Sequence, residues 1–296
     1  MKQPAAPLKI LVIGKTGQVA IELQKHLTGL GELIVLGRDT LHLNQPAQIR
    51  AQVRAHTPDL LINAAAHTAV DLAESEPALA YAINGTAPGV LAEEAGALGI
   101  PLIHYSTDYV FDGTQTAPYT ENDTPNPLGV YGKSKWMGER AITATGAQHL
   151  ILRTSWVYST HGKNFLLTLQ RLLQQRPEVR VVADQIGAPT WAGTLAQSTR
   201  ALIERWHAGE AGAWGTYHLT ARGETSWFGF AQAIAEDLIA QGKPCATLEA
   251  IPTRAYPTPA PRPLNSRLDC GLLEREWHII LPDWHRALSE CLIEQD

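Results

Sequence analysis

The sequence has few cysteines and no long apolar run. Its three cysteines, Cys245, Cys270 and Cys291, lie far apart without a CxxC pair, which argues against a disulfide framework or a zinc site. No segment approaches the roughly 18 apolar residues of a membrane span, and the run Leu8–Ile13 is shorter than a signal-peptide core. We therefore expect a cytoplasmic protein without a membrane partner.

Basic residues are also not in excess. The 24 Lys and Arg are outnumbered by 29 Asp and Glu, giving a formal charge of -5. Binding to nucleic acid needs a clear surplus of cations, so nucleic acid is not expected as the main partner. The hydrophobic content of 45% over 296 residues favours a packed fold with one large domain, or a large and a smaller one.

The first half alternates short apolar runs with helical patterns. Apolar runs that predict strands are Leu8–Ile13, Leu33–Leu36, Leu60–Ile62, Leu102–Tyr105 and Leu150–Leu152. Windows that predict helices are Gln18–Leu27, Pro77–Leu98 and Tyr131–Thr143, and in the second half Asn164–Gln175, Thr194–His207 and a segment from Thr225 or Ser226 to Gly242. This alternation predicts βαβ units and a parallel sheet covered on both faces. The proline-rich segment 252–263 is expected to be extended and ordered against another part of the chain.

A glycine loop follows the first predicted strand. Gly14, Gly17 and Ala20 form a GxxGxxA pattern, in which the glycines permit a sharp turn and close approach to a pyrophosphate, and the small third residue lets the helix pack on the strand. The pattern predicts dinucleotide binding, although an ordinary strand-to-helix turn is the alternative. We predict a Rossmann-like doubly wound sheet over residues 8–155 and a smaller C-terminal α/β substrate domain over 156–296, with some segments returning to the sheet.

The residues after the second strand bear on the cofactor. Arg38 stands where a basic side chain holds the 2′-phosphate of NADPH, and Asp39 stands beside it, where an acidic one bonds the ribose of NADH. Arg38 favours NADPH, Asp39 keeps NADH open, and a solvated surface arginine is the alternative.

Tyr131 and Lys135 are spaced i, i+4 and would share one helix face. A phenol can protonate a ketone oxygen, and a lysine ammonium about 5 Å away would lower its pKa by roughly two units. Ser106 and Thr107 end the fourth strand, at the sheet edge where ligands bind. These features predict a ketone-reducing site, whereas the Tyr–Lys spacing alone is common on surface helices.

Seven segments spread over nearly the whole chain carry a family resemblance. They are GKTGQVA (14–20), NAAAHTAVDLAESEP (63–77), HYSTDYVFDG (104–113), VYGKSKWMGE (130–139), RTSWVY (153–158), DQIGAPT (184–190) and YPTPAPRPLNSRL (256–268). In these segments the chain resembles the extended short-chain dehydrogenase/reductase family, and within it the dTDP-4-dehydrorhamnose reductases. The resemblance implies reduction of the C4 ketone of dTDP-4-dehydro-β-L-rhamnose, the last step of dTDP-L-rhamnose synthesis.

The resemblance also implies roles for individual residues. Tyr131 would donate the proton with Lys135 as its partner, and Thr107 would hold the sugar carbonyl. Cofactor contacts would come from Gly14, Thr16, Gly17, Gln18, Val19, Arg38, His42, Leu43, Ala64, Ala65, Ala66, His67, Thr68, Tyr105, Tyr131 and Lys135. The sugar nucleotide would contact Thr107, Asp108, Tyr131, Trp156 and Arg262. The acidic residues Asp71, Glu74 and Glu76 are expected to form a solvated helix start.

The chain departs from the family in two respects. Gly37 and Arg38 stand where some members have an acidic residue at the end of the second strand, which favours NADPH. The second departure concerns a metal. Some members bind Mg²⁺ through glutamates at a dimer contact; Glu22 matches one such position, but Gly193 stands where a second glutamate would lie. We therefore expect no metal site, and either a monomer or a homodimer. Two other functions stay open: a reductase of another nucleotide 4-keto-sugar, and a non-catalytic regulatory subunit on the same scaffold, like that of methionine adenosyltransferase.

Overall fold

A computed structural model describes residues 7–295, and its centre is a six-stranded parallel sheet. The strands are β1 (Leu8–Ile13), β2 (Gly31–Leu36), β3 (Leu60–Asn63), β4 (Leu102–Thr107), β5 (His149–Thr154) and β10 (Gly215–His218). Their order across the sheet is β10-β5-β4-β3-β1-β2. The order reverses direction after β1, which is the doubly wound arrangement, so the predicted fold class is confirmed.

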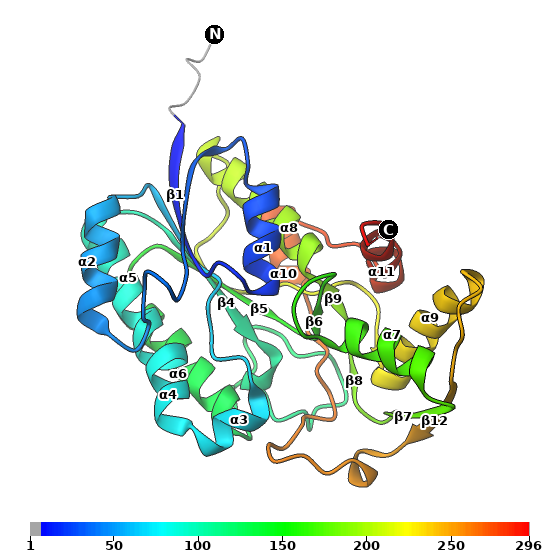
Figure 1. Ribbon diagram of the computed structural model, residues 1–296. Coiled ribbons are helices and arrows are strands. Elements are labelled where there is room, and N and C mark those ends of the chain that lie inside the picture. Colours follow the sequence, from blue (N-terminus) through cyan, green and yellow to red (C-terminus); the bar gives the residue numbers. More distant parts are fainter. Residues whose placement is uncertain (1–6, 296) are drawn as a thin grey trace.

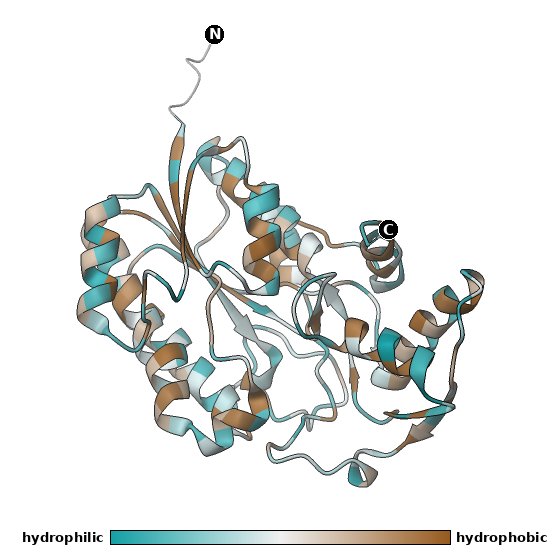
Figure 2. Ribbon diagram, viewed as in Figure 1, coloured by the Kyte–Doolittle hydropathy of each residue, from teal (hydrophilic) through white to brown (hydrophobic). Residues whose placement is uncertain are grey.

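Helices cover both faces of this sheet (Figure 1). One face carries α1 (Gln18–His26), α8 (Ala192–His207) and α10 (Gly271–Trp277), and the other carries α2 (Pro46–His56), α5 (Ala87–Leu98) and α6 (Val130–Ala144). Successive strand residues point to opposite faces, so Ile10 and Val12 pack toward α1 while Leu11 and Ile13 pack toward α2 and α5. This is why β1 and β3 are largely apolar, as the mostly brown colour of β1 shows (Figure 2).

The segment predicted as one helix over residues 77–98 consists of three helical pieces. A short helix α4 (Pro77–Tyr81) leads into a π-helical turn, η1 (Ala82–Thr86), and then into α5. Helix α3 (Val70–Ser75) precedes them. Pro88 lies inside the first turn of α5, and because the chain before it is already helical, its missing N–H interrupts the hydrogen-bond ladder where η1 meets α5. The π turn places Asn84 on the buried side, and π turns are frequent at functional sites.

A second hydrophobic cluster lies beside the sheet domain and is built mainly from the second half of the chain (Figure 1). Its helices are α7 (Phe165–Gln175), α9 (Trp227–Ala240) and α11 (Trp284–Ile293). Asn164 and Ser226 cap α7 and α9 through their side chains, as the sequence predicted for α9. Paired short strands complete this part: β7 (Glu178–Val182) with β12 (Thr247–Ile251), β6 (Val157–Tyr158) with β9 (Thr190–Trp191), and β8 (Ile186–Gly187) with β11 (Thr225–Ser226). Two 3₁₀ turns are η2 (Asp108–Val110) and η3 (Thr253–Ala255).

Segments from the second half return to the first. Strand β10 pairs in parallel with β5 at the edge of the sheet, and α8 packs on α1. The boundary predicted near residue 155 therefore does not divide the chain into two continuous segments that pack separately. The second half contributes both to the second hydrophobic cluster and to the sheet domain. The proline-rich segment is held against the first half, since Asp71 accepts from the N–H of Ala260 and pairs with Arg262. Within residues 7–295, no helix is both long and apolar enough to cross a membrane.

Candidate active site

The glycine loop sits at the carboxyl end of β1. Gly14 has a φ of 115°, a conformation that only glycine adopts readily, and a Cβ there would lie 3.2 Å from the backbone of Ala64 and Ala65. Gly17 begins α1, and nothing lies within 4 Å of the place a Cβ would take. The loop thus offers helix N–H groups next to open space, which is the geometry a pyrophosphate needs. Thr16 and Val19 lie in the same turn, and Gln18 reaches the carbonyl of Val157.

Of the two charged residues that follow β2, Asp39 forms an ion pair and Arg38 does not. Asp39 pairs with Lys15 of the glycine loop at 3.1 Å, and this hydrogen bond lowers the pKa of the Asp39 carboxyl. Arg38 is exposed, and its guanidinium makes no hydrogen bond or ion pair within the described residues 7–295. A paired aspartate beside an unengaged arginine is more suited to a 2′-phosphate than to a ribose hydroxyl. His42 is exposed on the following turn, and Leu43 packs near Ala65.

The segment after β3 runs beside the glycine loop. Ala64, Ala65 and Ala66 are half-buried, and Thr68 is exposed. The backbone of His67 is fixed by Asn84, which accepts from its N–H at 2.8 Å and donates to its carbonyl at 3.0 Å. Asn84 also donates to the Ser134 hydroxyl on α6. The π turn therefore ties this segment to the helix that carries Tyr131 and Lys135.

Thr107 and Tyr131 come together at the carboxyl end of β4. Burial is the largest influence on Tyr131 and raises its pKa to about 12; the neighbouring Thr107 hydroxyl acts against this rise, and the nearby Asp108 adds to it. The expected lowering of the Tyr131 pKa by Lys135 was wrong, because desolvation dominates and the groups that shift this pKa besides burial are Thr107 and Asp108. A phenol in this state is protonated at neutral pH and can act as a donor.

Lys135 is almost fully buried, at 2% exposure, one helical turn from Tyr131. Its Nζ donates to the Tyr105 carbonyl at 2.6 Å and lies 3.3 Å from Nε2 of His104. Desolvation lowers the pKa of Lys135 to about 8, although Glu139 acts in the opposite direction. The Tyr105 side chain points toward α8, where its hydroxyl bonds Thr199, so its backbone carbonyl is what faces Lys135.

Ser106 does not join this group. Its hydroxyl donates to Glu139, whose carboxylate forms a buried ion pair with Arg153 at 2.6 Å. The expectation that Ser106 and Thr107 both face a substrate was wrong for Ser106, because successive side chains of a strand point to opposite sides. The ion pair joins β4, β5 and α6 and holds the helix that carries the Tyr–Lys pair.

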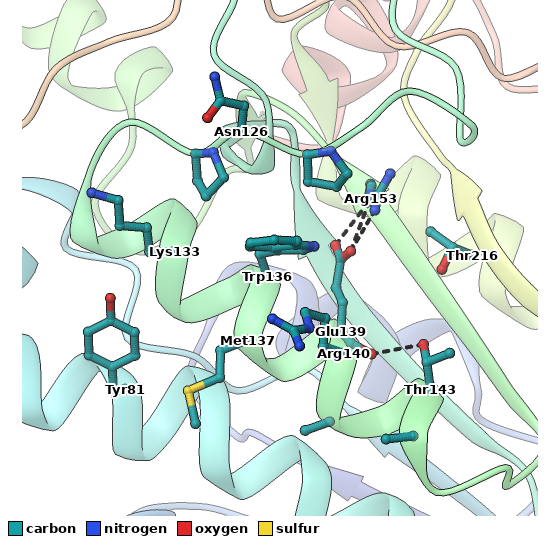
Figure 3. Close-up of a pocket in the computed structure, with 14 residues that line it drawn as sticks. Tyr81, Asn126, Lys133, Trp136, Met137, Glu139, Arg140, Thr143, Arg153 and Thr216 are labelled. Carbon is teal, nitrogen blue, oxygen red and sulfur yellow. Dashed lines mark hydrogen bonds and ion pairs between the residues drawn. The ribbon is translucent and has the colours of Figure 1, made fainter.

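An open pocket of about 1200 Å³ lies along the face of α6 that carries Lys133, Trp136 and Arg140 (Figure 3). Glu139 and Arg153 meet at its wall, and the Arg140 guanidinium lies 5.3 Å from the centre of the Trp136 ring. The lining includes neither the Tyr–Lys pair nor Thr107. The candidate active site is therefore the group formed by Tyr131, Lys135 and Thr107, which lies outside this pocket.

Trp156 stands in an unusual conformation. Its φ is 48°, which is uncommon for a bulky residue, and its ring stacks on Trp227 with centroids 3.7 Å apart. A Cβ at Gly187 would come within 2.7 Å of the Trp156 ring, so glycine is needed there. The ring is half-buried. The strained backbone and the paired indoles present a flat aromatic wall, a surface suited to an apolar sugar face or a base.

Arg262 is engaged with the acidic segment. It pairs with Asp71 at 2.8 Å, and Asp71 also accepts from the Ala260 N–H. Glu74 accepts from the N–H of Val130 at the start of α6, and Glu76 lies 3.6 Å from His67. The expectation of a merely solvated acidic cluster was wrong for Asp71 and Glu74, since Asp71 pairs with Arg262 and Glu74 accepts from the N–H of Val130.

The chain matches known proteins over almost its entire length. The model of the family described as RmlD substrate binding domain matches residues 8–296. A dTDP-4-dehydrorhamnose reductase of Burkholderia thailandensis is 46% identical over 292 residues, covering 96% of this chain and 98% of the relative. The chain belongs to the RmlD substrate binding domain family.

Solved structures of the RmlD family superpose closely on the chain. A dTDP-4-dehydrorhamnose reductase of Clostridium acetobutylicum has a TM-score of 0.90 at 35% identity, covering 97% of this chain and 99% of the other. One of Bacillus anthracis, solved in complex with NADP, has a TM-score of 0.89 at 32% identity, with the same coverage. The resemblance drawn from the sequence motifs is thereby confirmed.

The position at which some RmlD relatives were expected to bind Mg²⁺ has a different donor set here. Glu22 is fully buried, and its carboxylate lies 3.5 Å from His161, 3.7 Å from His26 and 3.9 Å from Lys25. A Cβ on Gly193 would lie 2.4 Å from the Trp191 ring, so no larger side chain fits there. Mg²⁺ prefers oxygen ligands, and nitrogen groups surround this carboxylate. The residues present do not fit a magnesium site.

Three residues near the site were not singled out from the sequence. Trp227 pairs with Trp156, Asn84 fixes His67, and His104 contacts Lys135. His104 falls within a motif that carried the resemblance, so its position was visible while its contact was not. Trp227 and Asn84 had no local sequence signal, because their partners, Trp156 and His67, are 71 and 17 residues away in the chain.

Proposed function

We propose that the chain reduces the C4 ketone of dTDP-4-dehydro-β-L-rhamnose to dTDP-L-rhamnose with a reduced nicotinamide cofactor. The observation that carries this proposal is the full-length relation to dTDP-4-dehydrorhamnose reductases, combined with a half-buried Tyr131 and the buried Lys135 and Thr107 at one sheet edge. Fold alone would not suffice, because the same scaffold serves many reactions.

Nicotinamide, when bound, supplies a hydride to carbon C4. The chain then has to place a proton on the developing alkoxide. Tyr131 fits this role because burial raises its pKa to about 12, so the phenol carries its proton at neutral pH. Thr107, which lies next to Tyr131 at the end of β4, would orient the ketone oxygen toward the phenol. Lys135 would hold cofactor hydroxyls and favour the phenolate left behind.

The remaining proposed contacts divide between cofactor and sugar nucleotide. The turn from Gly14 to Val19 would bind the pyrophosphate, with Arg38, His42 and Leu43 on the adenosine side. Residues 64–68 would flank the cofactor. Asp108, Trp156 and Arg262 would face the sugar nucleotide, and Arg262 would do so from a position fixed by Asp71.

For the cofactor we favour NADPH over NADH. Support comes from the exposed Arg38 beside an Asp39 that Lys15 already neutralises, and from the relative of Bacillus anthracis solved with NADP. Arg38→Ala should raise the KM for NADPH more than the KM for NADH, because only NADPH carries the 2′-phosphate. Equal effects on both cofactors would mark Arg38 as uninvolved.

The decisive assay is oxidation of NADPH and of NADH by the purified protein with dTDP-4-dehydrorhamnose. No oxidation with either cofactor contradicts the reductase function and leaves the regulatory-subunit alternative. Faster turnover of another nucleotide 4-keto-sugar would favour that alternative. Tyr131→Phe removes one oxygen and should reduce kcat by about 10²-fold or more with cofactor affinity little changed; full activity in this variant contradicts the assigned role.

We further propose that the protein works in the cytoplasm. Its three cysteines are unpaired in the structure, and a reducing compartment preserves thiols. Whether it acts as a monomer or a homodimer stays a prediction for a measurement of mass in solution.

A further inference from the structure

Behind Lys135 lies a buried chain of polar groups that the proposed reaction does not use. His104 on β4 is 1% exposed, and its Nε2 lies 3.3 Å from Nζ of Lys135. Its other ring nitrogen, Nδ1, lies 3.0 Å from the amide nitrogen of Asn63 on the neighbouring strand β3. With both ring nitrogens facing a partner, the orientation of the imidazole is fixed.

The side-chain amide of Asn63 is oriented by a backbone group. Its Oδ1 accepts a hydrogen bond from the N–H of Ala65 at 3.2 Å. A backbone N–H can only donate, so the amide oxygen must face Ala65 and the amide N–H₂ must face His104. Turning the amide over would set two N–H donors against each other at Ala65.

This orientation determines the tautomer of His104. Because Asn63 donates to Nδ1, Nδ1 carries the lone pair and the proton of the neutral imidazole is on Nε2. Burial and the nearby Lys135 and His149 hold the pKa of His104 well below its usual range, so the ring stays neutral. Its Nε2–H therefore points at the nitrogen of Lys135.

An ammonium has three donors and no lone pair, so it cannot accept this N–H. A neutral amine can, while it still donates to the Tyr105 carbonyl. In the other tautomer, Nδ1–H of His104 would face the N–H₂ of Asn63, so two donors would meet there instead. Turning the Asn63 amide would relieve that contact, but its N–H₂ would then face the N–H of Ala65. We propose that His104, oriented by Asn63, is a positioning residue that stabilises the neutral amine form of Lys135.

Charged groups around Lys135 do not supply this effect. Glu139 on the same helix favours the ammonium, but its carboxylate is paired with Arg153 on β5. Tyr131 is one turn away and is neutral at physiological pH. From β4 the groups that face Lys135 are His104 and the Tyr105 carbonyl. The hydrogen-bond array thus adds to burial in disfavouring the ammonium.

A neutral form of Lys135 is useful in the proposed function, on which this step of the inference rests. Reduction leaves Tyr131 as a phenolate, which must regain a proton. Transfer from the Lys135 ammonium to the phenolate gives an amine and a phenol, and the amine lone pair then meets the waiting N–H of His104. Solvent reprotonates Lys135 before the next turnover.

The test measures the Lys135 titration directly in the full-length protein. With ¹³C-labelled lysine, NMR follows each side chain against pH, and the Lys135 signal is identified by its loss in Lys135→Met. The wild-type midpoint should lie near 8. In His104→Gln the amide can turn its oxygen to the ammonium, so the midpoint should rise by about one unit, the effect of a hydrogen bond to a charged group.

Asn63→Leu tests the tautomer while His104 is kept and adds no charge near Lys135. Without the donor from Asn63, the imidazole proton can move to Nδ1, which leaves Nε2 as an acceptor and should raise the Lys135 midpoint as well. His149→Gln is the matched control: this histidine lies on β5, bonds the carbonyl of Ala147 and should leave the midpoint unchanged. Circular dichroism checks that each variant folds, and Asn63→Leu decides the question if His104→Gln does not.

Unchanged Lys135 midpoints in the folded variants overturn the proposal, even if kcat falls, because a merely structural role lowers activity without moving this titration. The NMR readout does not require turnover. A wild type that is inactive on the 4-keto-sugar therefore counts against the proposed function alone. In an active wild type, the pH limb of kcat assigned to Lys135 should move with the NMR midpoint.

Discussion

Asp108 is a buried carboxyl whose ionisation should make the folded protein less stable. It follows β4 directly, is 3% exposed, and accepts from the Thr107 hydroxyl at 3.0 Å. Its second oxygen, Oδ2, is a buried atom without a hydrogen-bond partner among residues 7–295. Burial raises the pKa of Asp108 from 3.8 to about 6, although hydrogen bonds from Ser266 and Thr107 act against the rise.

The size of the effect follows from this shift. A rise from 3.8 to about 6 is roughly two units, and at about 1.4 kcal/mol per unit it corresponds to about 3 kcal/mol. Because the pKa is higher in the folded state, the protonated carboxyl favours folding below pH 3.8, and this advantage is lost as the pH rises through about 6. Above that pH the ionised, buried Asp108 costs the full amount.

Asp108→Asn removes the ionisable group at almost unchanged volume. Unfolding in urea should show little difference between variant and wild type near about pH 4, and a gain of up to about 3 kcal/mol for the variant near about pH 7.5. Asp123→Asn is a control of opposite sign, because hydrogen bonds from Thr120 lower the Asp123 pKa. A difference between Asp108→Asn and wild type that does not change with pH would refute the reasoning.

Three further substitutions test the supports of the site. Glu139→Gln leaves the buried Arg153 cation without its charged partner. Thermal unfolding should then show that the free energy of unfolding falls by roughly 3–5 kcal/mol. A decrease smaller than that for an exposed ion pair would mean that water reaches Arg153. Glu74→Ala removes the acceptor for the Val130 N–H and should cost about 1 kcal/mol in urea unfolding, the usual value of a helix cap, whereas Glu74→Gln should retain most of it. Trp227→Ala removes the ring that stacks on Trp156 and should raise the KM for the sugar nucleotide while the cofactor KM stays constant; equal changes in both would place the stack outside the substrate region.

The sheet was predictable because its signal is local. Strands such as Leu8–Ile13 are apolar at every position except Lys9, since helices cover both faces. The edge strand β10 escaped prediction because its four residues, Gly215–His218, are few and mixed in character. Its place beside β5 depends on the parallel register Gly215↔Leu150 to His218↔Arg153, which no short window of sequence contains.

The site was predictable in its spacing and unpredictable in its electrostatics. The i, i+4 pattern brought Tyr131 and Lys135 to one face, but the expected lowering of the Tyr131 pKa assumed that an ammonium was the strongest influence. Burial depends on what packs over the ring, including Tyr109 at 5.5 Å between ring centroids. Desolvation therefore reversed the sign of the shift.

Contacts between distant residues were also missed in the acidic segment 71–76, whose carboxylates the sequence alone suggested to be solvated. Its partners are Arg262 and Val130, which are 191 and 56 residues away. Asp71 anchors the C-terminal loop and Glu74 anchors the start of α6, so two carboxylates three residues apart connect the proposed substrate loop to the helix that holds Tyr131. A substitution in this segment should therefore affect the geometry of the proton donor and of the sugar contacts together, even though neither carboxylate is assigned to the reaction itself.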